Sequence, residues 1–198
     1  MSKMKIGVAG AGAMGSGIAQ TAAMAGHDVL LFDESRQAVE KAFSSITSSL
    51  QKLEEKGKIK NAGEVIKKIT AIESLKDFSL CGFFIEAIIE NLEAKQKLFS
   101  SVEAVVSDEC ILASNTSSLS IASLAASCKN PVRFIGVHFF NPPVLMKLVE
   151  IIPGIRTSTN ITEQTTQLIQ SWSKTTVISQ IVTGAKAWST PKTHRALL

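Results

Sequence analysis

The stretch KIGVAGAGAMG, residues 5–15, joins a short apolar run to glycines spaced as Gly10-x-Gly12-x-x-Gly15. The apolar run predicts a buried strand, and the alanine-rich segment that follows it to about residue 25 predicts a helix. In this context Gly10 permits a tight turn, Gly12 lets a pyrophosphate approach the backbone, and Gly15 lets the helix pack closely. The helix N-terminus presents free N–H groups and a positive dipole end to an anion. The stretch therefore predicts a dinucleotide site, and a merely flexible turn is the alternative.

Asp33 ends a second apolar run, residues 29–33, which predicts the next strand. An acidic side chain at this place accepts hydrogen bonds from the ribose hydroxyls of an adenosine. It also repels a 2′-phosphate, so NAD is favoured over NADP. Arg36 lies close in sequence and could weaken that preference. The glycine turn and Asp33 together predict NAD as the cofactor.

Strand-like and helix-like segments alternate along the rest of the chain, which is typical of a mostly parallel sheet with helices on both faces. Further strands are predicted within 66–75 and at 82–89, 110–115, 133–140, 149–154 and 175–179, and helices at 34–57, 91–106, 119–127 and 162–174. Asn91 is placed to cap the N-terminus of its helix. The predicted fold is α/β, with a doubly wound sheet of the Rossmann type.

Composition narrows the class of protein. The chain has 198 residues, of which 45% are hydrophobic and 19% are charged, as in ordinary globular domains. No apolar run reaches the roughly 18–20 residues of a membrane span, and no signal segment precedes the first strand. Cys81, Cys110 and Cys128 lack the spacing of metal ligands and are expected to act as small apolar residues. The expectation is a cytoplasmic protein without a bound metal and without membrane contact.

The net charge of +4 comes from scattered basic residues, the densest group lying between Lys52 and Lys68. A solvated helix face explains this group, and attraction of a phosphate-bearing ligand is the alternative. The chain contains no Tyr, and aromatic residues do not interleave with the basic ones. Nucleic acid is therefore not an expected partner.

His138 opens the stretch HFFNPPVLMKLVE, residues 138–150, inside an apolar run. A histidine in such a run is commonly a core residue. However, it lies near the end of a predicted strand, where ligands gather in open α/β sheets. The NPP turn could bring the next strand back beside it, so that Glu150 reaches the imidazole. A carboxylate on one ring nitrogen fixes the tautomer and raises the basicity of the other.

Two other polar segments allow structural explanations. In SNTSSLS, residues 114–120, the hydroxyls are suited to capping a helix and to side-chain turns. In IEAIIENLEAK, Glu86 and Glu90 are predicted on one face of a strand, and an ordinary ion pair would join Glu90 to Lys95.

Four stretches, in this order and spacing, closely resemble the NAD-binding domain of 3-hydroxyacyl-CoA dehydrogenases, and in particular the bacterial 3-hydroxybutyryl-CoA enzymes. They are GVAGAGAMGSGIAQTAAMAGHDVLLFD, IEAIIENLEAKQKLF, ASNTSSLSI and GVHFFNPPVLMKLVEII. The resemblance implies oxidation of an L-3-hydroxyacyl-CoA to the 3-oxoacyl-CoA with NAD as hydride acceptor, or the reverse, as in fatty acid β-oxidation.

The resemblance also implies roles for individual residues. His138 matches the general base, Glu150 the carboxylate that orients it, and Ser117 a hydroxyl near the substrate. Cofactor contacts are implied at Gly10, Gly12, Met14, Gly15, Asp33, Glu90, Lys95 and Asn141. Coenzyme A contacts are implied near Ser49 and Lys56.

The likeness stops after about Ile178, which suggests an NAD-binding domain at 1–178 and a divergent tail at 179–198. In the family a helical domain follows, completes the acyl-CoA cleft and builds the dimer interface. The expectation is a truncated or frame-shifted gene product, or an excised domain carrying foreign residues, with impaired activity. Such a chain could form a homo-oligomer through surface that the helical domain would cover. Two alternatives remain, a catalytically silent NAD-binding module and a dehydrogenase acting on another hydroxyacid.

Overall fold

The computed structural model describes residues 3–179, which form one eight-stranded sheet with the order β3-β2-β1-β4-β5-β6-β7-β8. Its strands are β1 (Lys5–Ala9), β2 (Asp28–Phe32), β3 (Ile69–Ala71), β4 (Phe83–Glu86), β5 (Ile111–Ser114), β6 (Phe134–Phe139), β7 (Leu148–Pro153) and β8 (Thr175–Ile178). Neighbouring strands are parallel except β6 and β7, which are antiparallel. The predicted doubly wound, mostly parallel sheet is confirmed. Residues 180–198 lie outside the described part, so the proposed domain boundary and tail stay predictions.

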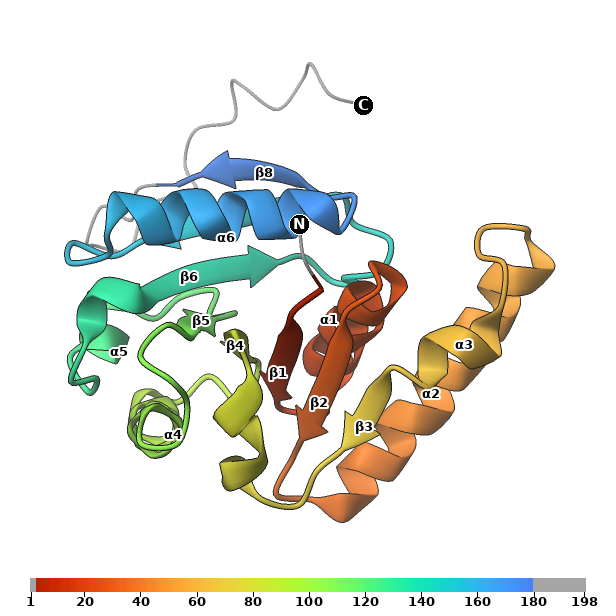
Figure 1. The fold of residues 1–198 in the computed structure, drawn as a ribbon, viewed down its shortest axis with the longest axis horizontal. Coiled ribbons are helices and arrows are strands. Elements are labelled where there is room, and N and C mark those ends of the chain that lie inside the picture. The colour runs from red at the N-terminus through yellow and green to blue at the C-terminus, as the bar shows by residue number, and fades with distance from the viewer. Residues whose placement is uncertain (1–2, 180–198) are drawn as a thin grey trace.

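Helices cover both faces of the sheet (Figure 1). They are α1 (Ala13–Met24), α2 (Arg36–Glu55), α3 (Ala62–Ile66), α4 (Leu92–Glu103), α5 (Ile121–Ala125) and α6 (Thr159–Ser171), with short 3-10 helices at Leu75–Leu80 and Pro131–Arg133. One apolar core joins α1, α2, α3 and α6 to one face of the sheet. A second core joins α4, α5 and the first 3-10 helix to the other face.

The sheet has a switch point at β1, because the chain builds outward to β2 and β3 on one side and to β4 and β5 on the other. In such folds ligands bind outside the carboxyl ends of the strands at this point. The topology therefore places the ends of β1 and β4, with the segments that follow them, at the predicted binding crevice.

The segment after β4 differs from its prediction. The strand expected at 82–89 ends at Glu86, so Glu86 and Glu90 do not share a strand face, and that prediction is wrong. The Ala87 N–H still bonds to Ala9, but the Ile88 N–H turns back to the Glu86 side chain. The chain thereby leaves the sheet before Glu90. Within 66–75 only Ile69–Ala71 forms a strand, while α3 and the two 3-10 helices were not predicted.

The three cysteines are buried and unpaired, which confirms the expectation that they pack as apolar residues. Burial raises the pKa of the Cys81 and Cys110 thiols to about 12, so both are protonated at neutral pH. None of the helices between residues 3 and 179 has the length and apolar character of a membrane span.

Candidate functional site

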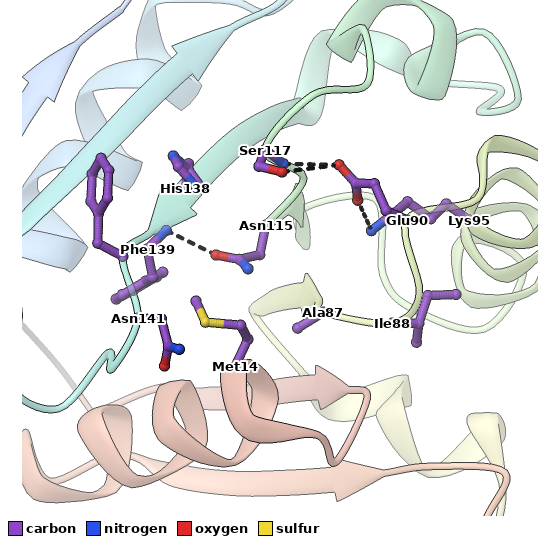
Figure 2. A pocket seen from close by; sticks show the side chains of 11 residues that line it. Met14, Ala87, Ile88, Glu90, Lys95, Asn115, Ser117, His138, Phe139 and Asn141 are labelled. Atoms are coloured by element: carbon purple, nitrogen blue, oxygen red, sulfur yellow. Dashed lines mark hydrogen bonds and ion pairs between the residues drawn. The ribbon is translucent and has the colours of Figure 1, made fainter. Parts of the chain in front are cut away.

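A cavity of about 310 Å³ opens at the carboxyl ends of β1, β4, β5 and β6 (Figure 2). The segments after these four strands converge here, because parallel strands end at one edge of the sheet. Its lining consists of Met14, Ala87, Ile88, Glu90, Lys95, Asn115, Ser117, His138, Phe139, Phe140 and Asn141. Six of the residues predicted for the site are among them: Met14, Glu90, Lys95, Ser117, His138 and Asn141.

The glycine turn lies between β1 and α1 and packs tightly against the end of β4. Gly10 has φ +103°, and a Cβ atom there would be 2.4 Å from the Ala87 carbonyl oxygen. At Gly15 an added Cβ atom would be 1.7 Å from the Gly10 carbonyl oxygen. A Cβ atom on Gly12 would meet nothing within 4 Å. Gly10 and Gly15 are therefore required by the fold itself, whereas Gly12 keeps an approach to the backbone open.

The N-terminus of α1 differs from those of the other described α-helices. Side chains of Ser35, Asn61, Asn91, Ser120 and Ser158 cap α2, α3, α4, α5 and α6. Gly12 caps α1 without any side-chain hydrogen bond, and no acidic residue lies in the first turn. The N–H groups there are available to an external anion, as a pyrophosphate would require. The glycine turn thus fits the diphosphate of a dinucleotide.

Asp33 joins the end of β2 to the glycine turn. Its Oδ2 accepts the Ala11 N–H at 2.7 Å, and its Oδ1 accepts the Ser35 N–H at 2.9 Å. The side chain is only half-buried, which leaves carboxylate lone pairs for ribose hydroxyls. Arg36, which could have weakened the NAD preference, instead pairs with Glu40 at 3.3 Å.

His138 and Glu150 face each other across the antiparallel pair β6 and β7. His138 Nδ1 lies 2.8 Å from Glu150 Oε2, and 14% of the imidazole is exposed. This arrangement confirms the expected return of the chain after the NPP turn. Glu150 does not line the cavity. A carboxylate at this position favours the tautomer that carries its proton on Nδ1, which leaves the lone pair on Nε2.

Glu90 is the anchor of a turn made by residues 116–118, here named the serine turn. Its Oε1 accepts the N–H groups of Ser117 and Ser118 at 3.0 and 3.1 Å, and also the Thr116 hydroxyl. Its Oε2 lies 3.1 Å from the ammonium of Lys95. Burial alone would raise the pKa of Glu90, but the Thr116 hydrogen bond and the Lys95 charge outweigh it and lower the pKa to about 2. Glu90 is therefore ionised throughout the physiological range.

Lys95 is more deeply buried than a lysine in an ordinary surface ion pair. Its side chain is 1% exposed and also pairs with Glu86, which is 0% exposed. Glu86 accepts two further hydrogen bonds, from the Ile88 N–H and from the Ser114 hydroxyl. Burial raises the pKa of Glu86, while Lys95 and these donors oppose the shift. The simple Glu90–Lys95 pair expected from the sequence is thus one half of a larger cluster.

Two residues of the site were missed. Glu86 was seen only as part of the predicted strand GFFIEAII, and the sequence did not show which partners would stabilise its charge. Asn115 lines the cavity, and its Oδ1 accepts the Phe139 N–H at 2.8 Å, joining the ends of β5 and β6. Its position directly after a strand, beside the hydroxyl cluster, was the signal that could have identified it.

Ser49 and Lys56 lie away from the cavity, on α2 and at its C-terminal end. Ser49 accepts a hydrogen bond from Gln20 of α1 at 2.9 Å, and Lys56 is exposed. Their contact with coenzyme A stays a prediction. Within the described residues, no group of three or more His, Cys, Asp or Glu side chains is placed to hold a metal ion.

An uncapped helix after a glycine turn, with an aspartate at the next strand end, defines the class of NAD-binding Rossmann domains. The family model described as "3-hydroxyacyl-CoA dehydrogenase, NAD binding domain" matches residues 5–182. The chain belongs to this family, and NAD is its cofactor.

Relatives and solved structures agree with the family. The chain is 44% identical to a "Probable 3-hydroxybutyryl-CoA dehydrogenase" of Deinococcus radiodurans, over 87% of this chain and 62% of that protein. Crystal structures of 3-hydroxybutyryl-CoA dehydrogenases from Escherichia coli and Ralstonia eutropha superpose with TM-scores of 0.88 and 0.87, each at 37% identity. The matched regions cover 91% and 90% of this chain, but only 39% of the Escherichia coli protein and 64% of the Ralstonia eutropha protein. The chain thus spans less than two thirds of these relatives.

Proposed function

We propose that this chain is the NAD-binding part of an L-3-hydroxyacyl-CoA dehydrogenase, which transfers hydride between C3 of a 3-hydroxyacyl-CoA and NAD. The observation that carries the proposal is the His138–Glu150 pair, with a 2.8 Å contact, at the edge of a cavity beside the glycine turn. A carboxylate-oriented imidazole is the base that oxidation of a hydroxyl requires.

The residues of the chain divide the work of the reaction. His138 would take the hydroxyl proton on Nε2, while Glu150 stabilises the imidazolium that forms. Ser117, which lines the cavity (Figure 2), would hydrogen-bond the substrate oxygen and orient C3. NAD, when bound, accepts the hydride from C3. In the reverse direction His138 returns the proton to the oxygen.

Cofactor binding would use the opposite side of the same crevice. The α1 N-terminus and Gly12 would hold the diphosphate, and Asp33 the adenosine ribose. Met14, Asn141, Glu90 and Lys95 line the cavity where the nicotinamide half would lie. Ser49 and Lys56 are proposed to contact coenzyme A. A cytoplasmic location, a homo-oligomer and reduced activity of the 198-residue chain also stay predictions.

The test is oxidation of NADH by the purified 198-residue chain with acetoacetyl-CoA as substrate, compared with His138→Ala. General acid–base catalysis contributes about 10²–10⁴-fold, so the variant should lose turnover by that factor. NADH titration by fluorescence should give similar dissociation constants for both proteins, which shows that the variant is folded. Glu150→Gln keeps the shape of the side chain, and its turnover should fall by less than that of His138→Ala.

Turnover that His138→Ala does not reduce would refute the assignment of His138. A folded chain that binds NADH without any turnover would favour the alternative, a catalytically silent NAD-binding module. Turnover with another hydroxyacid, but not with the acyl-CoA, would favour the other alternative.

A further inference from the structure

The carboxylate of Glu86 is an unusual group to find at this depth. It is 0% exposed, comes from the last residue of β4, and has no direct place in the cavity lining. A buried carboxylate is costly unless it is paired and hydrogen-bonded. All its partners lie toward the site: Lys95 at the start of α4, Ser114 at the end of β5 and the Ile88 N–H.

These contacts continue to the serine turn without a gap. Glu86 Oε1 contacts Lys95 Nζ, and the same ammonium lies 3.1 Å from Glu90 Oε2. The other oxygen of Glu90 then accepts the N–H groups of Ser117 and Ser118. A second connection runs from Glu86 Oε2 through the Ser114 hydroxyl, which accepts the Thr116 N–H at 3.2 Å. Both connections end at residues 116–118.

We propose that Glu86 is a positioning residue: by seating Lys95 it fixes Glu90, which holds the serine turn with Ser117 at the cavity. Glu90 alone could not do this, because its side chain is 36% exposed and a flexible carboxylate at the surface has many orientations. Lys95, at 1% exposed, is held in place and restricts Glu90 to one of them. The value of Ser117 as a substrate contact rests on the function proposed above, whereas the anchoring of the turn does not.

A second turn in the same protein supplies a matched control. Glu103, at the end of α4, accepts the N–H groups of Lys129 and Asn130 at 2.6 and 2.9 Å. Its own partner is Arg133, and their side chains are 6% and 3% exposed. This turn, residues 129–130, is here named the rear turn. Neither Glu103 nor Arg133 touches the cavity.

The experiment is residue-resolved amide hydrogen exchange by NMR on the 198-residue chain without ligand. In Glu86→Gln, the amides of Ser117 and Ser118 should exchange roughly tenfold faster, as expected when a charged hydrogen-bond acceptor is no longer held in place. The rear turn should exchange at its wild-type rate. Glu103→Gln should give the reverse pattern.

Two further variants show whether Glu86 acts through Lys95. Lys95→Met should accelerate exchange in the serine turn, and Glu86→Gln/Lys95→Met should accelerate it no further than Lys95→Met. The double variant buries no charge, so it should recover thermal stability without recovering protection of Ser117 and Ser118. If Glu86→Gln alone does not fold, the amide exchange of Ser117 and Ser118 in the double variant provides the test instead.

Wild-type exchange of Ser117 and Ser118 in Glu86→Gln, or in the double variant, would overturn the proposal. Equal acceleration of both turns would also overturn it, because that pattern reports a general loss of stability. Exchange is measured without turnover, so its outcome is independent of the His138 test. A chain with the expected exchange pattern but no acetoacetyl-CoA reduction would keep the anchoring and lose the proposed function.

Discussion

Helix α4 carries a buried ion pair near each end, and each pair is connected to a turn. Near its N-terminus Lys95 pairs with Glu86, and Glu90 then holds the serine turn. At its C-terminus Glu103 pairs with Arg133 and holds the rear turn. In both clusters a carboxylate accepts backbone N–H groups of a turn in the segment after β5.

The two clusters differ in what lies beside them. The first borders the cavity at the carboxyl ends of the strands, and Glu90 is partly open to it. The second cluster lies just before β5, where Arg133 donates hydrogen bonds to the backbone carbonyls of Ser107 and Cys110. A buried ion pair by itself is weak evidence of function, because structural pairs have the same chemistry. The cavity next to the first pair is what distinguishes it.

The strongest way to test this comparison is to remove the cation of each cluster. Lys95→Met and Arg133→Met each leave a buried carboxylate without its counter-charge, which should lower the free energy of unfolding by about 3–5 kcal/mol. Urea unfolding measures this loss. NADH titration should then distinguish the two variants. Lys95→Met should bind NADH roughly tenfold more weakly, a change of about 1.4 kcal/mol in binding free energy.

Arg133→Met should bind NADH like the wild type wherever it is folded, because Arg133 lies outside the cavity lining. Equal loss of NADH affinity in both variants would contradict the division between a cavity cluster and a purely structural one.

In the glycine turn, too, a structural residue can be distinguished from a cofactor-binding one, and the expected effects are smaller. In Gly15→Ala the new methyl group would collide with the Gly10 carbonyl, and overpacking of this kind costs about 1–3 kcal/mol or more. In Gly12→Ala the methyl group has open space, so thermal stability should change little. NADH affinity should nevertheless fall by roughly tenfold, because the methyl group occupies the approach to the α1 N-terminus.

Thermal melts and NADH titration on the two alanine variants provide the measurement. A Gly12→Ala protein with unchanged NADH affinity would show that the diphosphate does not lie against this turn.

The smallest expected effect is on the stability of the folded chain at acidic pH. The pKa of Glu90 is about 2 in the folded chain and 4.5 ordinarily, so the folded state binds fewer protons than the unfolded state between these values. The stabilisation by Glu90 is present above about pH 4.5 and is lost as the pH falls through 2. The melting temperatures of the wild type and Glu90→Gln should therefore converge as the pH falls through this window. A difference that stays constant with pH would show that Glu90 is not held as the structure indicates.

The sequence alone predicted the fold class and most of the site. The glycine turn, Asp33, the alternation of strands and helices, and the His138–Glu150 pair are local signals, because each depends on residues close in sequence or on strand periodicity. The resemblance to a dehydrogenase family rested on four longer stretches, which also implied Met14, Glu90, Lys95, Ser117 and Asn141, and the family is confirmed by the family model.

Only the tertiary structure revealed the burial of Glu86 and the hydrogen bond between Asn115 and Phe139. Glu86 at the end of β4 and Glu90 before α4 look alike in sequence, yet Glu86 is fully buried while Glu90 is partly open. That difference depends on where β4 ends and on what β5 and α4 bring to it. The donors that stabilise Glu86 come from Ser114 and Lys95 of those elements. Burial and hydrogen-bond partners of a charge are set by segments distant in sequence, so no local pattern could have determined them.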